Sequence, residues 1–140
     1  SGISCSGIIV ELTESGYLEG TPAVRSVWND MKQLRIQIAL DDFGTGYSNL
    51  MNISNLEPDI VKLDRGFTLK ALSRSYEYQL MQYVIEMVHK LNQYVCVEGV
   101  ETKEDLEKIK VLGPDLIQGY YYSKPCSRDE FLKKFFCYSE

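Results

Sequence analysis

The stretch "RIQIALDDFGTGYSNL", residues 35–50, decides how the fold is interpreted. Its first six residues predict a strand that ends at Asp41. Two adjacent carboxylates, Asp41 and Asp42, are followed at once by a Gly-Thr-Gly loop. Adjacent aspartates repel each other, and burying them without a partner is costly. The pair therefore indicates either a cation site or a turn or helix cap.

Working outward from this stretch, strands and helices alternate along the chain. Strands are predicted at "GIIVEL" (7–12), "RIQIAL" (35–40), "DIVKLD" (59–64), "YVCV" (94–97) and "DLIQGYYY" (115–122). Helices are predicted after Thr21-Pro22, briefly within 49–56, over 76–91, and behind capping boxes at Thr102/Asp105 and Ser127/Glu130. Five successive strand–helix units predict an α/β fold with a parallel sheet.

The spacing of apolar residues predicts which side chains face the core. The first helix should bury the stripe Val24, Val27, Trp28, Met31 and Leu34, and the long helix the stripe Tyr78, Met81, Ile85 and Val88. The tyrosines at 120–122 are placed in the fifth strand, where alternate side chains would face the interior.

Composition narrows the function class. The 140 residues suffice for one modest domain, and a net charge of −5 argues against a DNA-binding groove. No apolar run approaches the roughly 18 residues of a membrane span. The four cysteines form no CxxC pair and the chain has one histidine, so a structural zinc site is not expected. This use of cysteine predicts that the protein works in a reducing cytoplasm. No GxGxxG or Walker motif occurs.

Polar residues follow the apolar run of every predicted strand. In chain order they are Glu11, Asp41 and Asp42, Lys62 and Asp64, Glu98 and Glu101, and Gln118. The carboxyl ends of parallel strands carry the active site in barrel enzymes, so these groups are expected to converge. Converging carboxylates suit Mg²⁺ or Mn²⁺, and Lys62 would steady a water molecule or a developing negative charge. The alternatives are an exposed edge position for Lys62 and a helix-opening role for Glu98 and Glu101.

Five segments that contain these polar residues resemble, in order, the motifs of the EAL-domain family. The members of this family are phosphodiesterases that hydrolyse the bacterial messenger cyclic di-GMP. The five segments are "ELTE", "DDFGTGYSNL", "IVKLD", "VEGVET" and "QGYYYSKP", spanning Glu11 to Pro125. The resemblance implies a TIM-like barrel in which one strand runs antiparallel to the rest.

The resemblance also implies a role for each matching residue. Glu11 and Asp41 match metal ligands, and Asp42 matches a residue at a second metal. Lys62 matches the lysine that holds the attacking water, and Glu98 matches the proposed general base or a ligand of the second metal. Further matches are supporting residues, Glu101, Gln118 and Asp64, and the loop Phe43, Gly44, Thr45 and Gly46, which Glu14 steadies and which couples the site to dimerisation.

One departure from the family pattern is large. No Glu-Ala-Leu triplet occurs, and the family's metal-binding Asn and substrate-binding Arg have no match. We therefore interpret residues 1–140 as the C-terminal part of a single EAL domain, a partial barrel of about five strands that lacks the N-terminal strands. Its open sheet edges predict a homo-oligomer.

The expected activity is metal-dependent hydrolysis of cyclic di-GMP to the linear dinucleotide by the parent protein, with the 140-residue chain itself inactive. The alternatives are a catalytically inactive sensor that binds cyclic di-GMP, and another barrel enzyme that uses strand-end acids and a lysine for proton abstraction. A membrane anchor, if any, would lie in the parent rather than in this segment.

Overall fold

Five parallel strands form a single sheet whose spatial order follows the chain. In this computed structural model, which describes residues 5–13, 22–44, 53 and 57–136, the strands are β1 (Ile9–Thr13), β2 (Gln37–Phe43), β3 (Ile60–Leu63), β4 (Tyr94–Glu98) and β5 (Leu116–Gln118). The order is β1-β2-β3-β4-β5 and each neighbouring pair is parallel. The predicted α/β fold with five parallel strands is confirmed.

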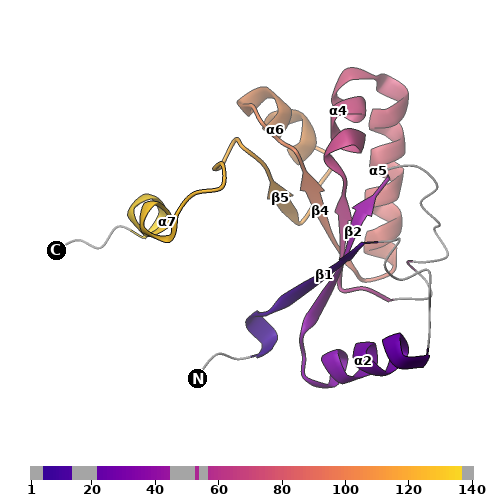
Figure 1. Cartoon of the computed structure of the whole chain (residues 1–140). Coiled ribbons are helices and arrows are strands. Elements are labelled where there is room, and N and C mark those ends of the chain that lie inside the picture. The colour runs from indigo at the N-terminus through magenta and orange to yellow at the C-terminus, as the bar shows by residue number, and fades with distance from the viewer. Residues whose placement is uncertain (1–4, 14–21, 45–52, 54–56, 137–140) are drawn as a thin grey trace.

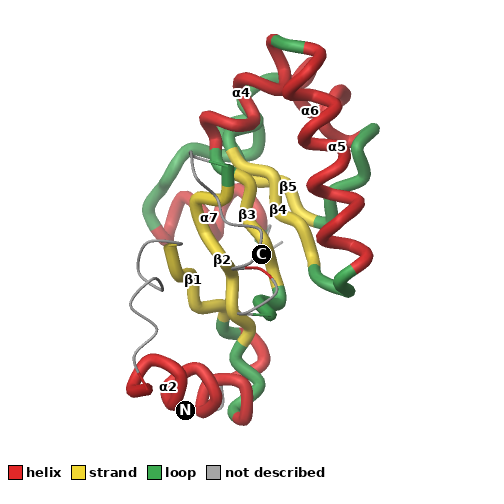
Figure 2. Tube along the Cα trace, turned by 90° about the vertical axis from the view of Figure 1, so that its right-hand side faces the viewer, coloured by secondary structure: helices red, strands yellow, loops and turns green. Residues whose placement is uncertain are grey.

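Helices connect the strands and gather mainly on one side of the sheet. They are η1 (Cys5–Gly7), α2 (Pro22–Gln33), α4 (Arg65–Ser73), α5 (Ser75–Lys90), α6 (Lys103–Lys110) and α7 (Arg128–Phe135). Helices α4, α5 and α6 lie together beside the sheet, α2 lies near its lower end, and α7 projects away after β5 (Figures 1 and 2).

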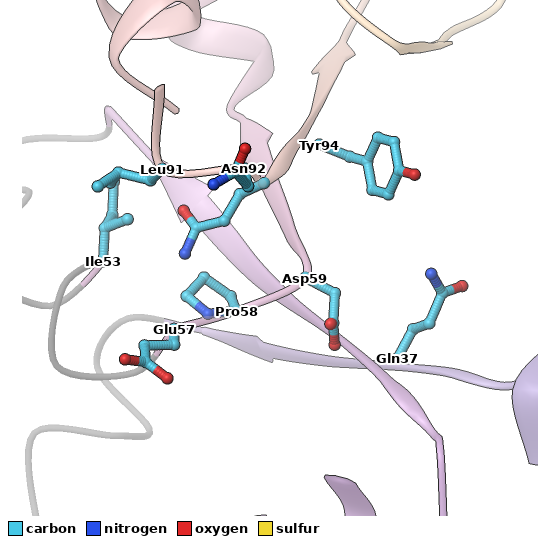
Figure 3. A pocket seen from close by; sticks show the side chains of 9 residues that line it. Gln37, Ile53, Glu57, Pro58, Asp59, Leu91, Asn92 and Tyr94 are labelled. Carbon is cyan, nitrogen blue, oxygen red and sulfur yellow. The ribbon is translucent and has the colours of Figure 1, made fainter. Parts of the chain in front are cut away.

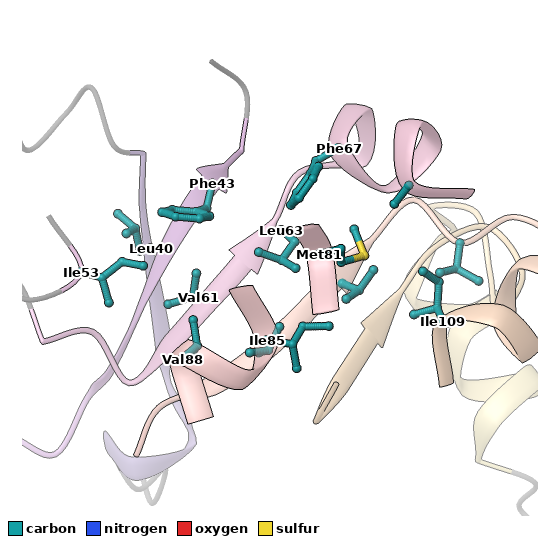
Figure 4. Packing of buried hydrophobic residues seen from close by; sticks show 14 of the residues in the cluster. Leu40, Phe43, Ile53, Val61, Leu63, Phe67, Met81, Ile85, Val88 and Ile109 are labelled. Atoms are coloured by element: carbon teal, nitrogen blue, oxygen red, sulfur yellow. The ribbon is translucent and has the colours of Figure 1, made fainter. Parts of the chain in front are cut away.

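The main core fills the space between the sheet and these helices. Alternate residues of the central strands point into it, among them Leu40, Val61 and Leu63, and face Met81 and Ile85 of α5 (Figure 4). The intervening residues Ala39, Ile60 and Cys96 form a small separate cluster on the opposite face, which we call the open face. This alternation is the period-two geometry of a strand, and it sends apolar and charged side chains to different faces.

The predicted helix stripes are confirmed for three of the four residues on α5, where Tyr78 is half-buried, and only in part for α2. Met81, Ile85 and Val88 are buried as expected, whereas Val27 and Leu34 are each 57% exposed. On α2 the core contact is made by Trp28, with Met31 packed against it. Leu34 follows the end of the helix, which explains its exposure.

Three elements differ from the prediction. Strand β2 does not end at Asp41 but continues through Phe43. Helix α4 was not predicted, and Asp64 caps its first turn. Strand β5 ends at Gln118, so the prediction that Tyr120, Tyr121 and Tyr122 lie in a strand is wrong. They follow it in a turn closed by hydrogen bonds from Tyr121 N to Val100 O and from Tyr122 N to Gly119 O, both 3.1 Å.

Several predictions fall outside the described residues. They are the N-cap at Thr21, most of the short helix within 49–56, and the site residues Glu14, Thr45 and Gly46. Among the helices that are described, none is long and apolar enough to cross a membrane.

Candidate active site at the carboxyl ends of the strands

One buried lysine lies at the point where three carboxylates converge. The ammonium Nζ of Lys62 is 2.9 Å from Glu11 Oε2, 3.0 Å from Asp41 Oδ1 and 2.8 Å from Glu98 Oε1. Each residue comes from a different strand, β3 for the lysine and β1, β2 and β4 for the acids. We call these four residues the Lys62 cluster.

Strand periodicity places the Lys62 cluster on the open face. Lys62 lies between Val61 and Leu63, which point into the core, and it pairs in register with Cys96 of β4. Glu98 lies two residues beyond Cys96, and Asp41 lies two residues beyond Ala39, so both carboxylates share the open face. The cluster is therefore a direct product of four neighbouring parallel strands, β1 to β4, in register.

A bulge in β2 separates the two adjacent aspartates. Leu40 pairs with Val61 and Phe43 pairs with Leu63, so β2 uses one residue more than β3 between these pairs. The irregular residue is Asp42, whose φ is +61°. Phe43 thereby returns to the core at 3% exposure, Asp41 faces Lys62, and Asp42 is exposed.

Burial and charge act in opposite directions on Lys62. The residue is only 5% exposed, and burial alone would lower the pKa of its ammonium. Contacts with Glu98, Glu11 and Asp41 outweigh burial, so the pKa of Lys62 lies above its ordinary value. The lysine is therefore a permanent cation at neutral pH, with three acids as its counter-ions.

Asp41 is the least satisfied member of the Lys62 cluster. Its Oδ1 atom is buried and has no hydrogen-bond partner among the described residues, although Lys62 Nζ lies 3.0 Å away. The contact with the ammonium is therefore an ion pair, and it is what compensates the charge of this oxygen. A buried carboxylate oxygen in this state is an available ligand for a cation.

A cleft opens beside Glu98. It measures about 340 Å³ and is lined by Arg65, Glu98, Gly99, Glu101, Gln118, Gly119 and Tyr120. The structure thus brings the predicted residues Glu98, Glu101 and Gln118 to one hollow at the carboxyl edge of the sheet. Its walls are held together by the backbone, since Val100 N donates to Gln118 O at 3.3 Å.

Arg65 is a residue of this cleft that sequence reasoning missed. Its Nη2 and Nε donate to Glu101 Oε1 at 2.7 Å and 3.1 Å, and Glu101 raises the pKa of the guanidinium. The available signal was its position, directly after Asp64 at the end of β3. The pair sets a cation and an anion on the rim of the cleft.

The other predicted residues lie outside the Lys62 cluster. Asp64 Oδ1 accepts from Gly66 N at 2.7 Å and from Phe67 N at 3.3 Å, which makes it the N-cap of α4. At Gly44, where φ is +101°, a Cβ atom would lie 2.8 Å from Phe67 Cδ1. Glycine therefore lets the chain leave β2 close to α4.

Two further hollows lie away from the Lys62 cluster. One, of about 360 Å³, lies at the amino ends of β2, β3 and β4 and is lined by Asp59, Asn92 and Tyr94 among others (Figure 3). The second, of about 600 Å³, lies between β5 and α7 and is lined mainly by apolar and aromatic side chains. Ligands of parallel sheets bind at the carboxyl ends of the strands, which favours the cleft beside Glu98.

The donor chemistry of the Lys62 cluster fits a divalent ion. Hard carboxylate oxygens are the ligands that Mg²⁺ and Mn²⁺ prefer, and Asp41 Oδ1 is a buried acceptor without a hydrogen bond. Among the described residues, however, no group of three acidic, histidine or cysteine side chains has the arrangement of a metal site. The ammonium of Lys62 lies where the carboxylates converge.

Comparison with known proteins identifies the family. The family model described as "EAL domain" matches residues 1–125. The chain belongs to the EAL domain family. A curated relative, the cyclic di-GMP phosphodiesterase PdeL of Escherichia coli, is 31% identical over 127 residues, which cover 91% of this chain and 35% of PdeL. The chain thus spans about a third of the length of PdeL.

Solved structures of EAL proteins have the same fold. The EAL enzyme Bd1971, bound to cAMP and cyclic di-GMP, superimposes with a TM-score of 0.86 at 32% identity, covering 94% of this chain and 35% of that one. The manganese and cyclic di-GMP complex of Klebsiella pneumoniae BlrP1 gives a TM-score of 0.82 at 28% identity, with coverages of 89% and 32%. A calcium and cyclic di-GMP complex of BlrP1 also matches.

Proposed function

We propose that these residues form part of the active site of a cyclic di-GMP phosphodiesterase, with the Lys62 cluster as its chemical centre. The observation that carries the proposal is the position of Glu98. Its Oε1 atom lies 2.8 Å from Lys62 Nζ, and the residue also lines the cleft at the strand ends. A carboxylate and a cation thus lie side by side where a phosphodiester would bind. Family membership supports cyclic di-GMP as the substrate.

In this proposal Glu98 and Lys62 act together on a water molecule. The ammonium orients the water, and the Glu98 carboxylate accepts one of its protons. The resulting hydroxide attacks phosphorus, the bond from phosphorus to the ribose 3′ oxygen breaks, and that oxygen takes up a proton. The product is the linear dinucleotide pGpG, which keeps a 5′-phosphate.

The proposed cofactor is Mg²⁺ or Mn²⁺, held by Glu11 and Asp41, with Asp42 at a second ion. Such an ion lowers the pKa of water and polarises a phosphoryl oxygen when bound. The support is the carboxylate chemistry of this chain and the metal complexes of BlrP1. On the protein side, Arg65 and Glu101 form the rim of the cleft and position whatever enters it.

The chain is proposed to supply the C-terminal part of its EAL domain and to act in the cytoplasm. Its five strands leave β1 and β5 without a further neighbour in the described sheet. A TIM-type barrel has eight strands and typically about 250 residues, so a five-stranded sheet is open. We expect the 140-residue chain by itself to show no efficient hydrolysis.

Product analysis tests the proposal. A protein that contains these residues within a complete EAL domain is incubated with cyclic di-GMP and Mg²⁺ or Mn²⁺, and nucleotides are separated by chromatography. We expect pGpG to accumulate with the complete domain and cyclic di-GMP to survive with the 140-residue chain. Efficient cleavage by the short chain would refute its proposed inactivity.

The sensor alternative is distinguished by the same samples. A domain that binds cyclic di-GMP, as measured by equilibrium dialysis, but returns it intact would be a sensor. The observation that keeps this candidate open is the lysine at the convergence point, with no metal-type arrangement among the described residues.

A further inference from the structure

We infer that Lys62 is the resident counter-ion of the three carboxylates and that a divalent ion must displace its ammonium from Asp41 in order to bind. The inference deepens the proposed function, because it takes from it which carboxylates would hold the ion. It concerns the order in which cations occupy the site, and it gives Lys62 two successive partners.

The geometry makes one cation exclude the other. All three contacts to Lys62 Nζ are 3.0 Å or shorter, so the three carboxylate oxygens surround a single point. An ion that ligates the same oxygens of Glu11 and Asp41 that now face Lys62 requires this point or one beside it. Two cations in contact repel strongly in a poorly hydrated site, so the ammonium and the ion cannot share it.

Burial makes the lysine a persistent occupant. Lys62 lies on β3, whose four residues are all buried, and only 6% of its side chain is exposed. Removing an ammonium from three carboxylates leaves buried charge uncompensated until another cation arrives. The chain is therefore expected to fold without a metal, because its own lysine neutralises part of the acid cluster.

Asp41 marks the place where displacement begins. Its Oδ1 atom faces Lys62 at 3.0 Å without a hydrogen bond. An ammonium that loses Asp41 keeps Glu98, the carboxylate on the cleft. The displaced lysine thus moves toward the cleft, where the proposed chemistry needs it.

Thermal unfolding of the 140-residue chain with and without Mn²⁺ tests the inference. We expect millimolar Mn²⁺ to change the melting temperature of the unmodified chain very little. Lys62→Met should melt at a lower temperature without metal, regain stability with Mn²⁺, and bind the ion at least about tenfold more tightly. The matched control is Lys108→Met, which removes an exposed lysine paired with Glu104 at 2.8 Å and should leave ion binding unchanged.

Equal stabilisation of the unmodified chain and Lys62→Met by Mn²⁺ would overturn the inference. If Lys62→Met does not fold, nuclear magnetic resonance of the lysine ammonium groups in the unmodified chain decides. An ion-paired Lys62 ammonium should give a protected signal that shifts or vanishes as Mg²⁺ binds. Saturation of the site with Mg²⁺, at whatever concentration that requires, with the signal unchanged would contradict displacement. Neither readout uses turnover, so failure here leaves the phosphodiesterase proposal standing, and failure of that proposal leaves the ion measurements valid.

Discussion

Asp41 and Asp42 show how a single backbone irregularity separates two like charges. In a regular strand they would alternate between the open face and the core, so that Asp42 would be buried among apolar side chains. Because of the bulge, where Asp42 has a φ of +61°, Asp42 is exposed and Phe43 takes the core position instead. Asp and Asn tolerate this left-handed backbone better than most residues. The pair is thus divided between two environments.

Substitutions of Asp42 test this explanation. Asp42→Val places a β-branched residue at positive φ and should lower the free energy of unfolding by about 1–2 kcal/mol more than Asp42→Asn does. Urea denaturation followed by circular dichroism measures the difference. Both variants lose the carboxylate, so a charge effect cancels. Equal stability of the two would show that the backbone conformation is not what selects aspartate here.

Cys96 reports on the environment beside the Lys62 cluster. Burial, reinforced by the negative charge of Glu98, raises the pKa of its thiol to about 11, and a thiol in that state is a poor nucleophile. At pH 8 we therefore expect a thiol reagent to modify exposed Cys126 at least about tenfold faster than Cys96. Mass spectrometry of labelled peptides separates the two sites. Rapid native labelling of Cys96 would contradict the buried position.

The identity of the candidate residues could be predicted from sequence, but their contacts could not. Acids and a lysine after successive apolar runs are visible in the printed chain. The convergence on Lys62 depends on strand register and on the bulge at Asp42, neither of which has a reliable local signal. The pair of Arg65 and Glu101 was missed because it joins the first residue of α4 to the loop after β4, 36 residues away in sequence.

At the scale of elements, two aspartates connect neighbouring strands in the same way. Ile38 N donates to Asp59 Oδ2, and Val95 N donates to Asp115 Oδ2, each at 2.8 Å. In both cases the aspartate follows a proline and directly precedes a strand, in "PDIV" and "PDLI". The carboxylates thereby fix where β2 and β4 begin relative to the next strand. The Asp59 contact acts on the β2–β3 register, on which the Lys62 cluster depends.

Loss of these carboxylates should destabilise the sheet. Asp59→Ala and Asp115→Ala each leave a backbone donor without its partner, and we expect each to lower the free energy of unfolding by about 1–3 kcal/mol. Asp30→Ala, at an exposed position on α2, is the control and should change it by less than about 0.5 kcal/mol. Chemical denaturation at neutral pH gives all three values. If neither Asp59→Ala nor Asp115→Ala changed the free energy of unfolding, the role of these carboxylates would be refuted.

The effect of Asp115→Ala should depend on pH. Burial favours the neutral carboxyl, but hydrogen bonds from Val95 N and His89 outweigh it, so the pKa of Asp115 is lowered. A lowered pKa adds stability that is complete above the unfolded value of about 4 and is lost as pH falls through the folded value. The stability difference from the unmodified chain should therefore shrink in acid, as denaturation between pH 3 and pH 7 would show.

Most elements were predictable because their signals are local. Capping boxes at Thr102 and Ser127 were read directly from the chain and are confirmed. Helix α4 was missed because it begins Arg-Gly-Phe-Thr, residues that are mostly weak helix formers. Asp64 and packing of Phe67 against the core stabilise it instead. Strand β5 was overestimated because tyrosines favour strands even where the chain turns at Gly119.

At the scale of the molecule, the sheet exposes strands at both edges. Ile8 and Ile9 at β1 are 41% and 47% exposed, and Leu116 of β5 is also exposed. Edge strands with apolar side chains pair readily with other chains. We propose that the 140-residue chain covers these edges by forming a homo-oligomer.

Sedimentation velocity tests that proposal. The unmodified chain should sediment as a dimer or larger species at micromolar concentration, and Ile9→Lys should shift it toward the monomer, because an edge lysine discourages strand pairing. The control is Val111→Lys, at an exposed position in the turn after α6, which should not change the distribution of sedimenting species. A monomeric unmodified chain would rule the proposal out.

The most direct test of the whole account is the rate of cyclic di-GMP hydrolysis by a complete EAL domain that carries Glu98→Gln. Removing the proposed base while keeping its shape should lower kcat by about 10²–10⁴-fold, with the fold and melting temperature preserved. Glu104→Gln, on the exposed face of α6, is the matched control and should hydrolyse at the unmodified rate. A Glu98→Gln domain that produces pGpG within a few-fold of the unmodified rate would contradict the assignment of the Lys62 cluster as the active site.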